Sequence, residues 1–383
     1  MPDVTVVGGG PAGTISARLL ATSGRDVVLL EEHHCSGVPT HCAGVVSRDV
    51  LEGLGVHADI VGTISSADVV LPDGNVIHTS KRMPYAYVLD RAKLDQDLAD
   101  AASDAGVDIR YGAHYKSYER TSDNITVTSN IGQFKSDLLV GADGQNSVIA
   151  ASLGNNHVKK YLRGIQVDIK HRCDDEEKMI LRLGSEVAPG FFAWQLPLGD
   201  ITRVGLAISA DCGSPNHYLE RLLKNTGLDG CERLETYAGR IPLGGRRVTY
   251  SDRILLIGDS AGQIKPVSGG GLYPITRVAP LLKETVDRAY SMDLFNSTVL
   301  ALYERSWKRE IGKTLSRGYR LRNFYDRLDD QELCEFGAIF ARPDVSELLS
   351  DIDVDDPSNV VKPILKMKGV KGHLLKTYLR TLI

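Results

Sequence analysis

Two glycine turns, at residues 8–13 and 258–262, constrain the fold of this chain more than any other feature. The first reads G-G-G-P-A-G and follows the apolar strand-like run Val4–Val7, and the second reads G-D-S-A-G and follows the apolar residues 254–257. A short apolar run that breaks at glycine and continues as a helix is typical of a buried parallel strand that leads into a nucleotide-binding turn. The sequence therefore predicts a dinucleotide-binding α/β fold.

Each glycine of the first turn has a separate expected task. Gly8 permits the tight turn, Gly10 lets the backbone approach a pyrophosphate, and Gly13 allows the helix to pack closely on the strand. Pro11 suits the first helical position because the amide that it lacks would have no partner there. The remaining amides of this helix N-terminus, near Ala12, are expected to face the phosphates.

Acidic residues and a third glycine run indicate which dinucleotide is bound. Glu31 ends the second apolar strand, where a carboxylate can accept hydrogen bonds from ribose hydroxyls. Asp259 lies in the second turn, and S-G-G-G follows at residues 268–271. A cofactor whose far half is also held by backbone is FAD rather than NAD. No further turn of this kind is visible for NAD(P)H, so the electron donor stays open.

Composition limits the remaining function classes. A chain of 383 residues suits two or three domains, and its net charge of −4 gives no reason to expect a nucleic-acid partner. Six scattered cysteines and the absence of a signal-peptide pattern favour a reducing cytosol. No apolar run approaches the roughly 20 residues of a transmembrane helix. We expect a cytoplasmic protein, with peripheral contact at the inner membrane surface left open.

The pattern along the chain predicts that the dinucleotide fold is interrupted and then resumed. Residues 58–88 alternate like strands, Arg91 opens an amphipathic helix, and residues 160–250 are rich in strands. We expect an FAD-binding domain, an inserted antiparallel catalytic sheet and a helical C-terminal region. The expected boundaries are 1–60, 86–155 and 250–295 for the first, 61–85 and 156–249 for the second, and 296–383 for the third.

These motifs, with Arg91 and the G-A-D-G run at 141–144, resemble the FAD-dependent hydroxylase-like flavoproteins of the p-hydroxybenzoate-hydroxylase kind. Within that group the chain is similar to the geranylgeranyl reductases, notably the archaeal enzymes that saturate digeranylgeranylglycerophospholipids. Residues 37–42 (G-V-P-T-H-C) resemble that family's cysteine loop, and residues 265–274 its flavin-side glycine loop. Residues 189–197 resemble its P-x-x-Y-x-W-x-F-P signature, although Phe192 replaces Tyr and Leu196 replaces Phe.

The resemblance implies an activity and a set of site residues. The implied activity is saturation of isoprenoid double bonds in geranylgeranyl chains of membrane-lipid precursors. The implied partners are a polyprenyl lipid and an external reductant, either ferredoxin or NAD(P)H. The cofactor-binding candidates are Gly8, Gly10, Ala12, Gly13, Glu31, Cys42, Ala43, Gly44, Arg91, Asp143, Asp259, Gly270, Gly271 and Leu272.

The implied chemistry requires a dry, aromatic site. An isoprenoid double bond carries no electron-withdrawing group, so the plausible route is protonation at one carbon and hydride delivery to the other. Aromatic faces can stabilise the positive charge that develops. Phe191, Phe192 and Trp194 suit such a wall, and Phe192 and Trp194 fall on the same face of a strand. The alternative is that these side chains are ordinary sheet core.

Three interpretations of Cys42 remain open. His33, His34, Cys35, His41 and Cys42 lie within ten residues, which suggests a metal site, but their spacing matches no common zinc pattern. A structural role is the second interpretation. The third, which we favour, is a thiol near the flavin that relays a proton or tunes the cofactor. We expect no metal and take Cys42, Phe192 and Trp194 as the catalytic candidates.

The C-terminal part carries two further features, and the scaffold is compatible with two other functions. Asp351, Asp353 and Asp355 imitate a calcium loop, but the glycine and the final glutamate of that motif are missing. Residues 360–383 are basic and amphipathic, so they form either a membrane-surface helix or a helix docked on the protein. On the same scaffold, an aromatic monooxygenase and a lipid-binding or electron-transfer flavoprotein are the alternative functions.

Overall fold

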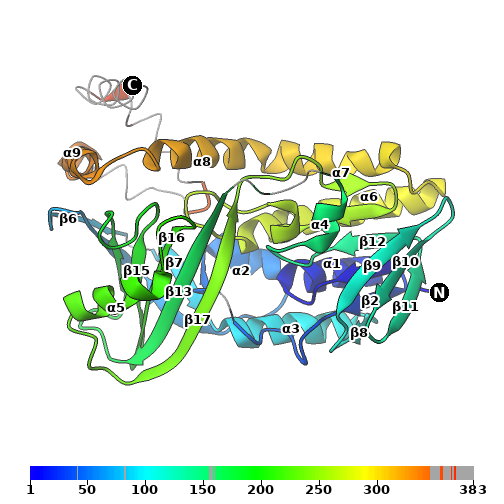
Figure 1. The fold of residues 1–383 in the computed structure, drawn as a ribbon, viewed down its shortest axis with the longest axis horizontal. Coiled ribbons are helices and arrows are strands. Elements are labelled where there is room, and N and C mark those ends of the chain that lie inside the picture. Colours follow the sequence, from blue (N-terminus) through cyan, green and yellow to red (C-terminus); the bar gives the residue numbers. More distant parts are fainter. Residues whose placement is uncertain are drawn as a thin grey trace.

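The computed structural model describes residues 1–345, except 41, 82, 155–157 and 159, together with residues 354–356, 364, 366 and 367. Two large β-sheets form the body of the protein, and long helices lie along one side of it (Figure 1). The mixed α/β class expected from the sequence is confirmed.

A six-stranded sheet forms the frame of the dinucleotide fold. Its order is β18-β19-β12-β1-β2-β8, and every pair is parallel except β18–β19. All residues of β1, β2, β12 and β19 are buried, as expected for parallel strands that are covered on both faces. The strands are β1 (Val4–Val7), β2 (Val27–Leu30), β8 (Asp108–Arg110), β12 (Leu138–Gly141), β18 (Tyr250–Ser251) and β19 (Ile254–Leu256).

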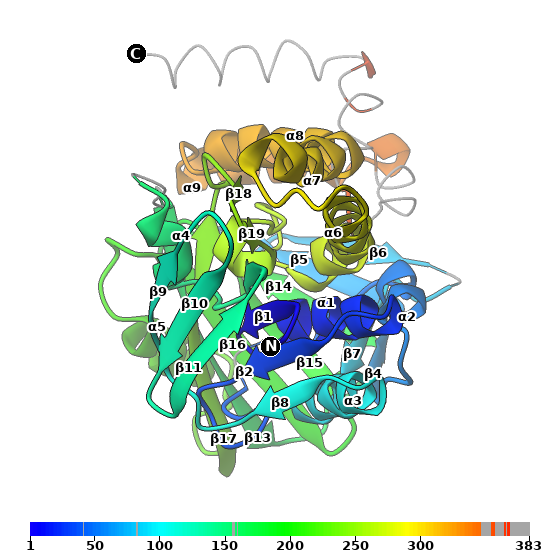
Figure 2. The ribbon, with the colours of Figure 1, turned by 90° about the vertical axis from the view of Figure 1, so that its right-hand side faces the viewer.

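Helices and a small sheet cover the two faces of this frame. Helix α1 (Pro11–Thr22) contacts both α3 (Arg91–Asp104) and α6 (Leu272–Met292), and their apolar residues form one core cluster with the sheet. The opposite face is covered by the short helix α4 (Val148–Ser152) and by strands β9 (Tyr115–Arg120), β10 (Ile125–Ser129) and β11 (Gly132–Ser136). Figure 2 shows β9–β11 on one side of β1 and the helices on the other.

A seven-stranded sheet carries the aromatic candidates. Its order is β17-β13-β16-β15-β14-β5-β6, and helix α5 (Pro215–Asn225) packs on one face against β13 and β16. Neighbouring strands are antiparallel, as expected, except for the parallel pair β14–β5. The strands are β5 (Ser66–Val70), β6 (Val76–Ser80), β13 (Lys160–Lys170), β14 (Lys178–Arg182), β15 (Ala193–Leu198), β16 (Ile201–Ser209) and β17 (Arg233–Leu243).

A second small sheet lies between the two large ones. It contains β3 (Val45–Val46), β7 (Ala86–Leu89) and β4 (Ile60–Ile64), and β4 contacts β15 of the seven-stranded sheet. Helix α2 (Arg48–Leu54) follows β3 and contacts α6. Residues 61–64 therefore pair with β7 rather than with the seven-stranded sheet. The division of the chain into domains at the expected boundaries stays a prediction.

The described C-terminal part is helical. Helices α7 (Ser297–Glu310) and α8 (Gly312–Tyr325) follow α6 along one side of the protein, and α9 (Asp330–Phe340) lies at the end of this row (Figure 1). Among the described helices, none is both long and apolar enough to span a membrane. The basic segment 360–383, apart from Ile364, Lys366 and Met367, lies outside the described residues, as do Asp351 and Asp353.

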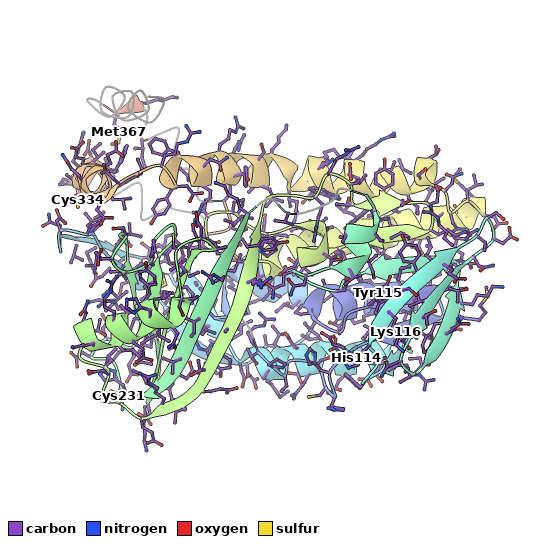
Figure 3. The ribbon with its side chains drawn as sticks, in the orientation of Figure 1. His114, Tyr115, Lys116, Cys231, Cys334 and Met367 are labelled. Carbon is purple, nitrogen blue, oxygen red and sulfur yellow. The ribbon has the colours of Figure 1, made fainter. Side chains whose placement is uncertain are left out.

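All six cysteines are free thiols in the structure. Figure 3 shows how far apart two of them lie, with Cys231 at the lower end of the long strands β13 and β17 and Cys334 on α9.

Candidate active site

The first glycine turn packs tightly at Gly8, Gly9 and Gly13 and is open at Gly10. A Cβ on Gly8, whose φ is +108°, would lie 2.3 Å from the carbonyl oxygen of Ala142, and a Cβ on Gly13 would lie 1.8 Å from that of Gly8. A Cβ on Gly10 would meet no heavy atom within 4 Å. Gly8 and Gly13 are therefore required by the fold itself, whereas Gly10 faces open space at the N-terminus of α1. That is the geometry that a pyrophosphate needs.

Glu31 lies buried against this turn at the end of β2. Its carboxylate accepts a hydrogen bond from the Gly9 amide at 2.6 Å and another from the His33 amide at 2.8 Å, and the His33 ring lies 2.6 Å away. The Ala113 amide donates to the Glu31 carbonyl oxygen at 2.8 Å. His33 is thus engaged by Glu31, and the contact of this carboxylate with a ribose hydroxyl stays a prediction.

Ser36 and Ala113 were missed by sequence reasoning. The Ser36 hydroxyl donates to the Gly9 carbonyl oxygen at 3.0 Å and braces the turn from the following loop. Ala113 braces Glu31 from the segment after β8. Neither residue belongs to a sequence motif, because each contacts a residue that is distant along the chain and is brought close only by folding.

The second turn places Asp259 beside the N-termini of two helices. It forms a short 3₁₀ helix, Gly258–Ala261, and a Cβ on Gly258 would lie 2.7 Å from that of Ala12. A Cβ on Gly271, which precedes Leu272 at the start of α6, would lie 3.2 Å from Asp259 Oδ1. Both glycine turns therefore open onto the same space, with Asp259 between them.

Burial raises the pKa of Asp259 to about 6, although the nearby Arg91 guanidinium acts in the opposite direction. Within the described part of the chain, no hydrogen bond to this carboxylate is formed. A buried carboxylate without donors is costly, so it suits a ligand that brings hydroxyl groups. The ribityl chain of FAD is such a ligand.

The loop before α6 is held in shape by its own backbone and by a distant acid. The Lys265 amide donates to the Gly270 carbonyl oxygen at 3.0 Å, and the Gly269 amide donates to the Lys265 carbonyl oxygen at 2.8 Å. The Lys265 ammonium contacts the buried carboxylate of Asp355 at 2.5 Å. The acid that the sequence interpretation rejected as a calcium ligand therefore anchors the glycine loop instead.

Cys42 lies between the FAD-binding frame and the seven-stranded sheet. Its sulfur accepts from the Gly44 amide at 3.5 Å and is a hydrogen-bond partner of Arg91. Arg91 is in turn paired with Asp95 at 2.9 Å. Burial lowers the pKa of Arg91, but the charges and hydrogen bonds of Asp95 and Cys42 outweigh it and raise the pKa above its ordinary value.

Arg203 on β16 approaches the same loop from the other side. It donates two hydrogen bonds to the Asp168 carboxylate, at 2.7 and 2.8 Å, and a third to the carbonyl oxygen of Ala43 at 2.9 Å. Burial lowers the pKa of Arg203, while the hydrogen bonds and charge of Asp168, with smaller contributions from Tyr237 and Cys42, raise it overall. Two guanidinium groups from different parts of the fold thus lie close to the Cys42 sulfur.

The metal interpretation receives no geometric support from the residues that can be described. No group of three or more histidine, cysteine, aspartate or glutamate side chains there could hold an ion. His41 lies outside the described residues.

The three aromatic candidates are in contact with one another, and their buried member, Phe191, stacks on Phe192 with ring centroids 4.0 Å apart. Phe192 and Trp194 meet edge to face, with ring centroids 6.2 Å apart, and both are half-buried. The Trp194 indole nitrogen donates to Gln166 at 3.3 Å, and the ring lies over Gly205, where a Cβ would come within 2.6 Å of it. Phe191, which the sequence groups with them, is 1% exposed and packs into the core.

This wall adjoins the Cys42 loop. Trp194 and Ala43 pack against the same apolar cluster, which contains Ile64, Ala86, Val88 and Leu196. Arg203 also donates to Ala43, so the Cys42 loop is fixed in position relative to the sheet that carries Trp194. The structure therefore brings Trp194 and Ala43, the neighbour of Cys42, to one apolar cluster, and Phe192 joins them through its contact with Trp194.

Asp143 is committed to its own loop. Its carboxylate accepts from the Ser147 hydroxyl at 2.6 Å and from the Ile149 amide at 3.2 Å, which fixes the start of α4. Burial raises its pKa, and these hydrogen bonds offset part of that rise. Its neighbour Ala142 contacts Gly8, so a role of Asp143 in cofactor binding stays a prediction and would act through the loop.

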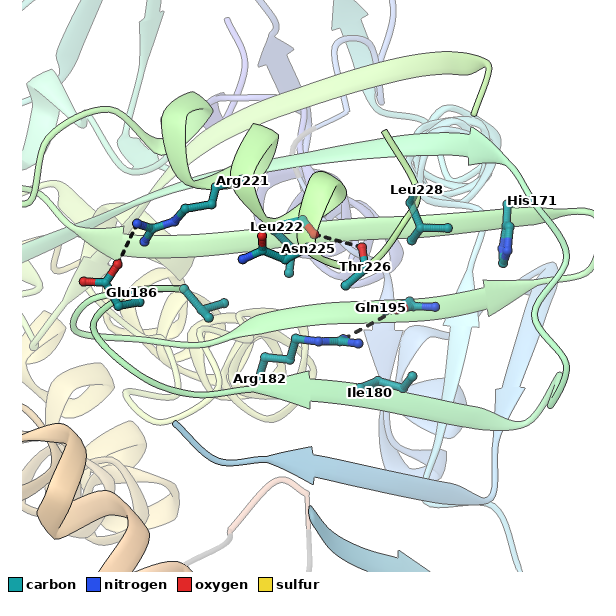
Figure 4. Close-up of a pocket in the computed structure, with 11 residues that line it drawn as sticks. His171, Ile180, Arg182, Glu186, Gln195, Arg221, Leu222, Asn225, Thr226 and Leu228 are labelled. Carbon is teal, nitrogen blue, oxygen red and sulfur yellow. Dashed lines mark hydrogen bonds and ion pairs between the residues drawn. The ribbon is translucent and has the colours of Figure 1, made fainter. Parts of the chain in front are cut away.

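The cavity in Figure 4 is not part of this site. It has a volume of about 300 Å³ and lies between α5 and strands β14 and β15, lined by residues such as Arg182, Gln195 and Thr226. Gln195 is the neighbour of Trp194 on β15, so its side chain points to the opposite face of the sheet. The cavity therefore lies behind the aromatic wall.

A dinucleotide frame with two convergent glycine turns and a sheet of aromatic residues at its edge defines an FAD-dependent oxidoreductase. Consistent with this, residues 1–183 match the family described as FAD binding domain. A digeranylgeranylglycerophospholipid reductase of Methanothermobacter thermautotrophicus is 31% identical over 353 residues, covering 86% of this chain and 89% of that protein. The chain belongs to the geranylgeranyl reductase family of FAD flavoproteins.

Two further comparisons agree. An uncharacterized protein of Methanocaldococcus jannaschii is 27% identical over 378 residues, or 95% of each chain. A crystal structure from Thermoplasma acidophilum, described as geranylgeranyl bacteriochlorophyll reductase-like, has a TM-score of 0.84 at 21% identity and covers 98% of this chain and 99% of that one. At that identity the likeness concerns the fold alone.

Proposed function

We propose that this protein saturates the isoprenoid double bonds of geranylgeranyl chains in a membrane-lipid precursor. The observation that carries the proposal is the aromatic pair Phe192–Trp194. Its tryptophan packs against the same apolar cluster as Ala43, which follows Cys42 in the loop beside the FAD-binding frame. The 31% identical relative is named as a digeranylgeranylglycerophospholipid reductase, which supports the same substrate class.

The described residues fit FAD. Gly10 leaves room for a pyrophosphate, Glu31 is positioned for a ribose, and Asp259 offers an unused carboxylate to the ribityl hydroxyls. Bound FAD, once reduced by ferredoxin or NAD(P)H, supplies the hydride that the double bond receives.

The protein groups then have two tasks. The faces of Trp194 and Phe192 stabilise the positive charge that develops on the tertiary carbon and exclude water from it. Cys42 relays or orients the proton that the other carbon receives, while Arg91 and Arg203 fix the position of its loop. We further propose that the protein works at a membrane surface, since its substrate is a lipid.

Anaerobic reoxidation of the dithionite-reduced protein tests the function. A geranylgeranyl lipid should restore the oxidised flavin spectrum, whereas the fully saturated analogue should not. Equal reoxidation by both lipids, or by neither, would contradict the proposal. An oxygenated flavin adduct that forms only with air and substrate would identify a monooxygenase instead.

A second experiment tests the assignment of Cys42. The Cys42→Ser variant is nearly isosteric but loses the thiol chemistry, because a hydroxyl has a far higher pKa than the thiol's ~8.5. It should keep the FAD content of the wild type and become reoxidised slowly by the lipid. Cys35→Ser is the matched control and should behave as wild type. Wild-type kinetics in Cys42→Ser would remove the thiol from the reaction.

A further inference from the structure

Two arginines face each other on neighbouring strands without a counter-ion. Arg163 of β13 and Arg240 of β17 are direct partners in the antiparallel register. Neither forms an ion pair with any acid in the described ranges. Like charges directly opposite each other destabilise a sheet. A pair of this kind is therefore expected where it serves a purpose other than folding.

The arginines line a hollow together with the loop that follows β12. The groove has a volume of about 460 Å³, and its polar lining consists of Gln145, Asn146, Arg163 and Arg240. Volumes of this size are typical of small-molecule sites. Gln145 and Asn146 come directly after the segment whose Ala142 contacts the first glycine turn, so the groove lies beside the FAD-binding frame.

Two residues that line this groove each bury a polar atom that has no partner within the described structure. These atoms are the Gln145 carbonyl oxygen Oε1 and the Arg163 nitrogen Nε. A buried polar atom without a hydrogen bond costs free energy unless a ligand or water provides one. The first requires a donor and the second an acceptor, so the groove favours a ligand that carries both.

The groove is distinct from the candidate active site. Gln166 of β13 accepts from Trp194 and so lies on the aromatic face of the sheet. Arg163 is an odd number of residues away and points to the other face, where its guanidinium donates to the Gly213 carbonyl oxygen before α5. A ligand held by Arg163 and Arg240 therefore does not occupy the flavin side of the sheet.

We propose that this groove binds the phosphate ester of a polyol. The two guanidinium groups match the charge and the acceptor oxygens of a phosphate, and a hydroxyl of the same ligand satisfies Gln145. The volume of the groove fits such a group better than a protein surface. Two sources offer this chemistry: the ribose phosphate of a nucleotide electron donor and the glycerophosphate headgroup of a lipid. Only the choice between these two sources rests on the proposed function.

Titration calorimetry of the FAD-loaded full chain tests the site without any turnover. The probes are ADP, glycerol 1-phosphate and inorganic phosphate. Either or both organic probes should bind more tightly than inorganic phosphate, and the tighter of the two identifies the source. The Arg163→Gln and Arg240→Gln variants should each weaken binding about ten-fold or more, as loss of a charge-assisted hydrogen bond predicts, while the flavin spectrum stays that of the wild type.

Two further variants make the test specific. Gln145→Ala should weaken the organic probes and leave inorganic phosphate unaffected. Arg233→Gln is the matched control, because Arg233 lies on the same strand β17 but is paired with Glu220 at 2.6 Å, and it should not change binding. The proposal is overturned if no probe binds at millimolar concentration, if Arg233→Gln weakens binding equally, or if Arg240→Gln releases FAD. Binding of an acidic protein in place of all three probes would likewise refute it.

Discussion

Arg203 on β16 donates to the carbonyl oxygen of Ala43 across 2.9 Å, and this contact joins the seven-stranded sheet to the loop that carries Cys42. The guanidinium is fixed from behind by both oxygens of Asp168. Since Arg203 and Asp168 are each less than 10% exposed, their pair is protected from solvent and orients the loop firmly. The position of Cys42 therefore depends on residues of both parts of the fold.

Removing the charge of Asp168 should expose this dependence. Asp168→Asn leaves a buried guanidinium without its counter-ion, which should lower the free energy of unfolding by about 3–5 kcal/mol. Arg203→Lys keeps the charge but loses the fork geometry, so it should slow lipid-driven reoxidation several-fold while FAD stays bound. Chemical denaturation and stopped-flow absorbance measure the two effects.

The exposed pair Arg233–Glu220 provides the control for Asp168→Asn. Glu220→Gln should cost less than about 1 kcal/mol, because surface ion pairs contribute little. Equal losses in the two variants would show that Asp168 has no special structural role. If Arg203→Lys is reoxidised at the wild-type rate, the guanidinium of Arg203 has no role in the reaction.

Trp194 should matter more for turnover than for stability. If its ring stabilises developing positive charge by ~1–2 kcal/mol, Trp194→Ala should lower the rate of the dithionite-reduced enzyme roughly ten-fold or more. Trp194→Phe should recover part of this loss. The chain has one other tryptophan, Trp307, which is buried and donates to Thr249 at 2.9 Å.

Trp307 supplies the matched comparison. Trp307→Phe removes its hydrogen bond far from the aromatic wall, so it should reduce thermal stability and leave the rate per bound flavin unchanged. If Trp194→Ala instead loses only stability, like Trp307→Phe, then Trp194 is ordinary core.

Substitutions at the open position Gly10 and at the packed position Gly13 should cause opposite defects. The first should lose FAD and keep the fold, and the second should destabilise the fold. Gly10→Val has room in the apoprotein, so the variant should fold with a stability loss of about 1 kcal/mol, the size of an altered N-cap, yet remain colourless. Gly13→Ala would force a Cβ against the Gly8 carbonyl oxygen and should destabilise the fold itself. Absorbance at the flavin bands and thermal unfolding measure the difference. Full FAD occupancy in Gly10→Val would place the pyrophosphate elsewhere.

Asp259 should make FAD binding depend on pH. Its pKa in the ligand-free protein is raised to about 6. Hydroxyl donors of the cofactor favour the charged carboxylate, so binding should lower this pKa and release a proton. The affinity for FAD should therefore rise as pH increases from 5 to 7 through about 6, and Asp259→Asn should flatten that rise. An unchanged slope in Asp259→Asn would assign the pH dependence to another group.

The same group gives a prediction for the apoprotein. A raised folded pKa means that the folded state binds the proton more tightly than the unfolded chain. The stabilising contribution is then complete below the unfolded value near 3.8 and is lost as pH rises through about 6. At pH 7 the wild-type apoprotein should therefore be less stable than Asp259→Asn, by about 1–3 kcal/mol at most.

The local features of the fold were predictable because they depend on few residues. The strand, glycine turn and helix at the N-terminus follow from consecutive residue types, and the structure shows why Gly8 and Gly13 have no alternative. The order of parallel frame, inserted sheet and C-terminal helices also follows from the periodicity. The parallel pairing of β14 with β5 does not, because strand register over a long separation is set by packing.

The contacts that position the site were less predictable. Asp168 and Arg203 are 35 residues apart, and Lys265 and Asp355 are 90 apart, so no local pattern connects either pair. Phe191 and Phe192 are identical in type and adjacent, and their rings stack, yet Phe191 is buried and Phe192 half-buried, a difference that the residue types could not show. Asp143 lies in a sequence motif that is typical of cofactor binding, but its carboxylate accepts hydrogen bonds from Ser147 and Ile149.

The most direct test of the central claim is mass spectrometry of a geranylgeranyl lipid incubated anaerobically with the FAD-loaded, dithionite-reduced protein. The account predicts that the lipid gains one H₂ for each double bond that disappears, and that the Trp194→Ala variant gives the same products more slowly. An unchanged lipid mass in the presence of fully reduced flavin, or a product that has gained oxygen once air is admitted, would contradict it.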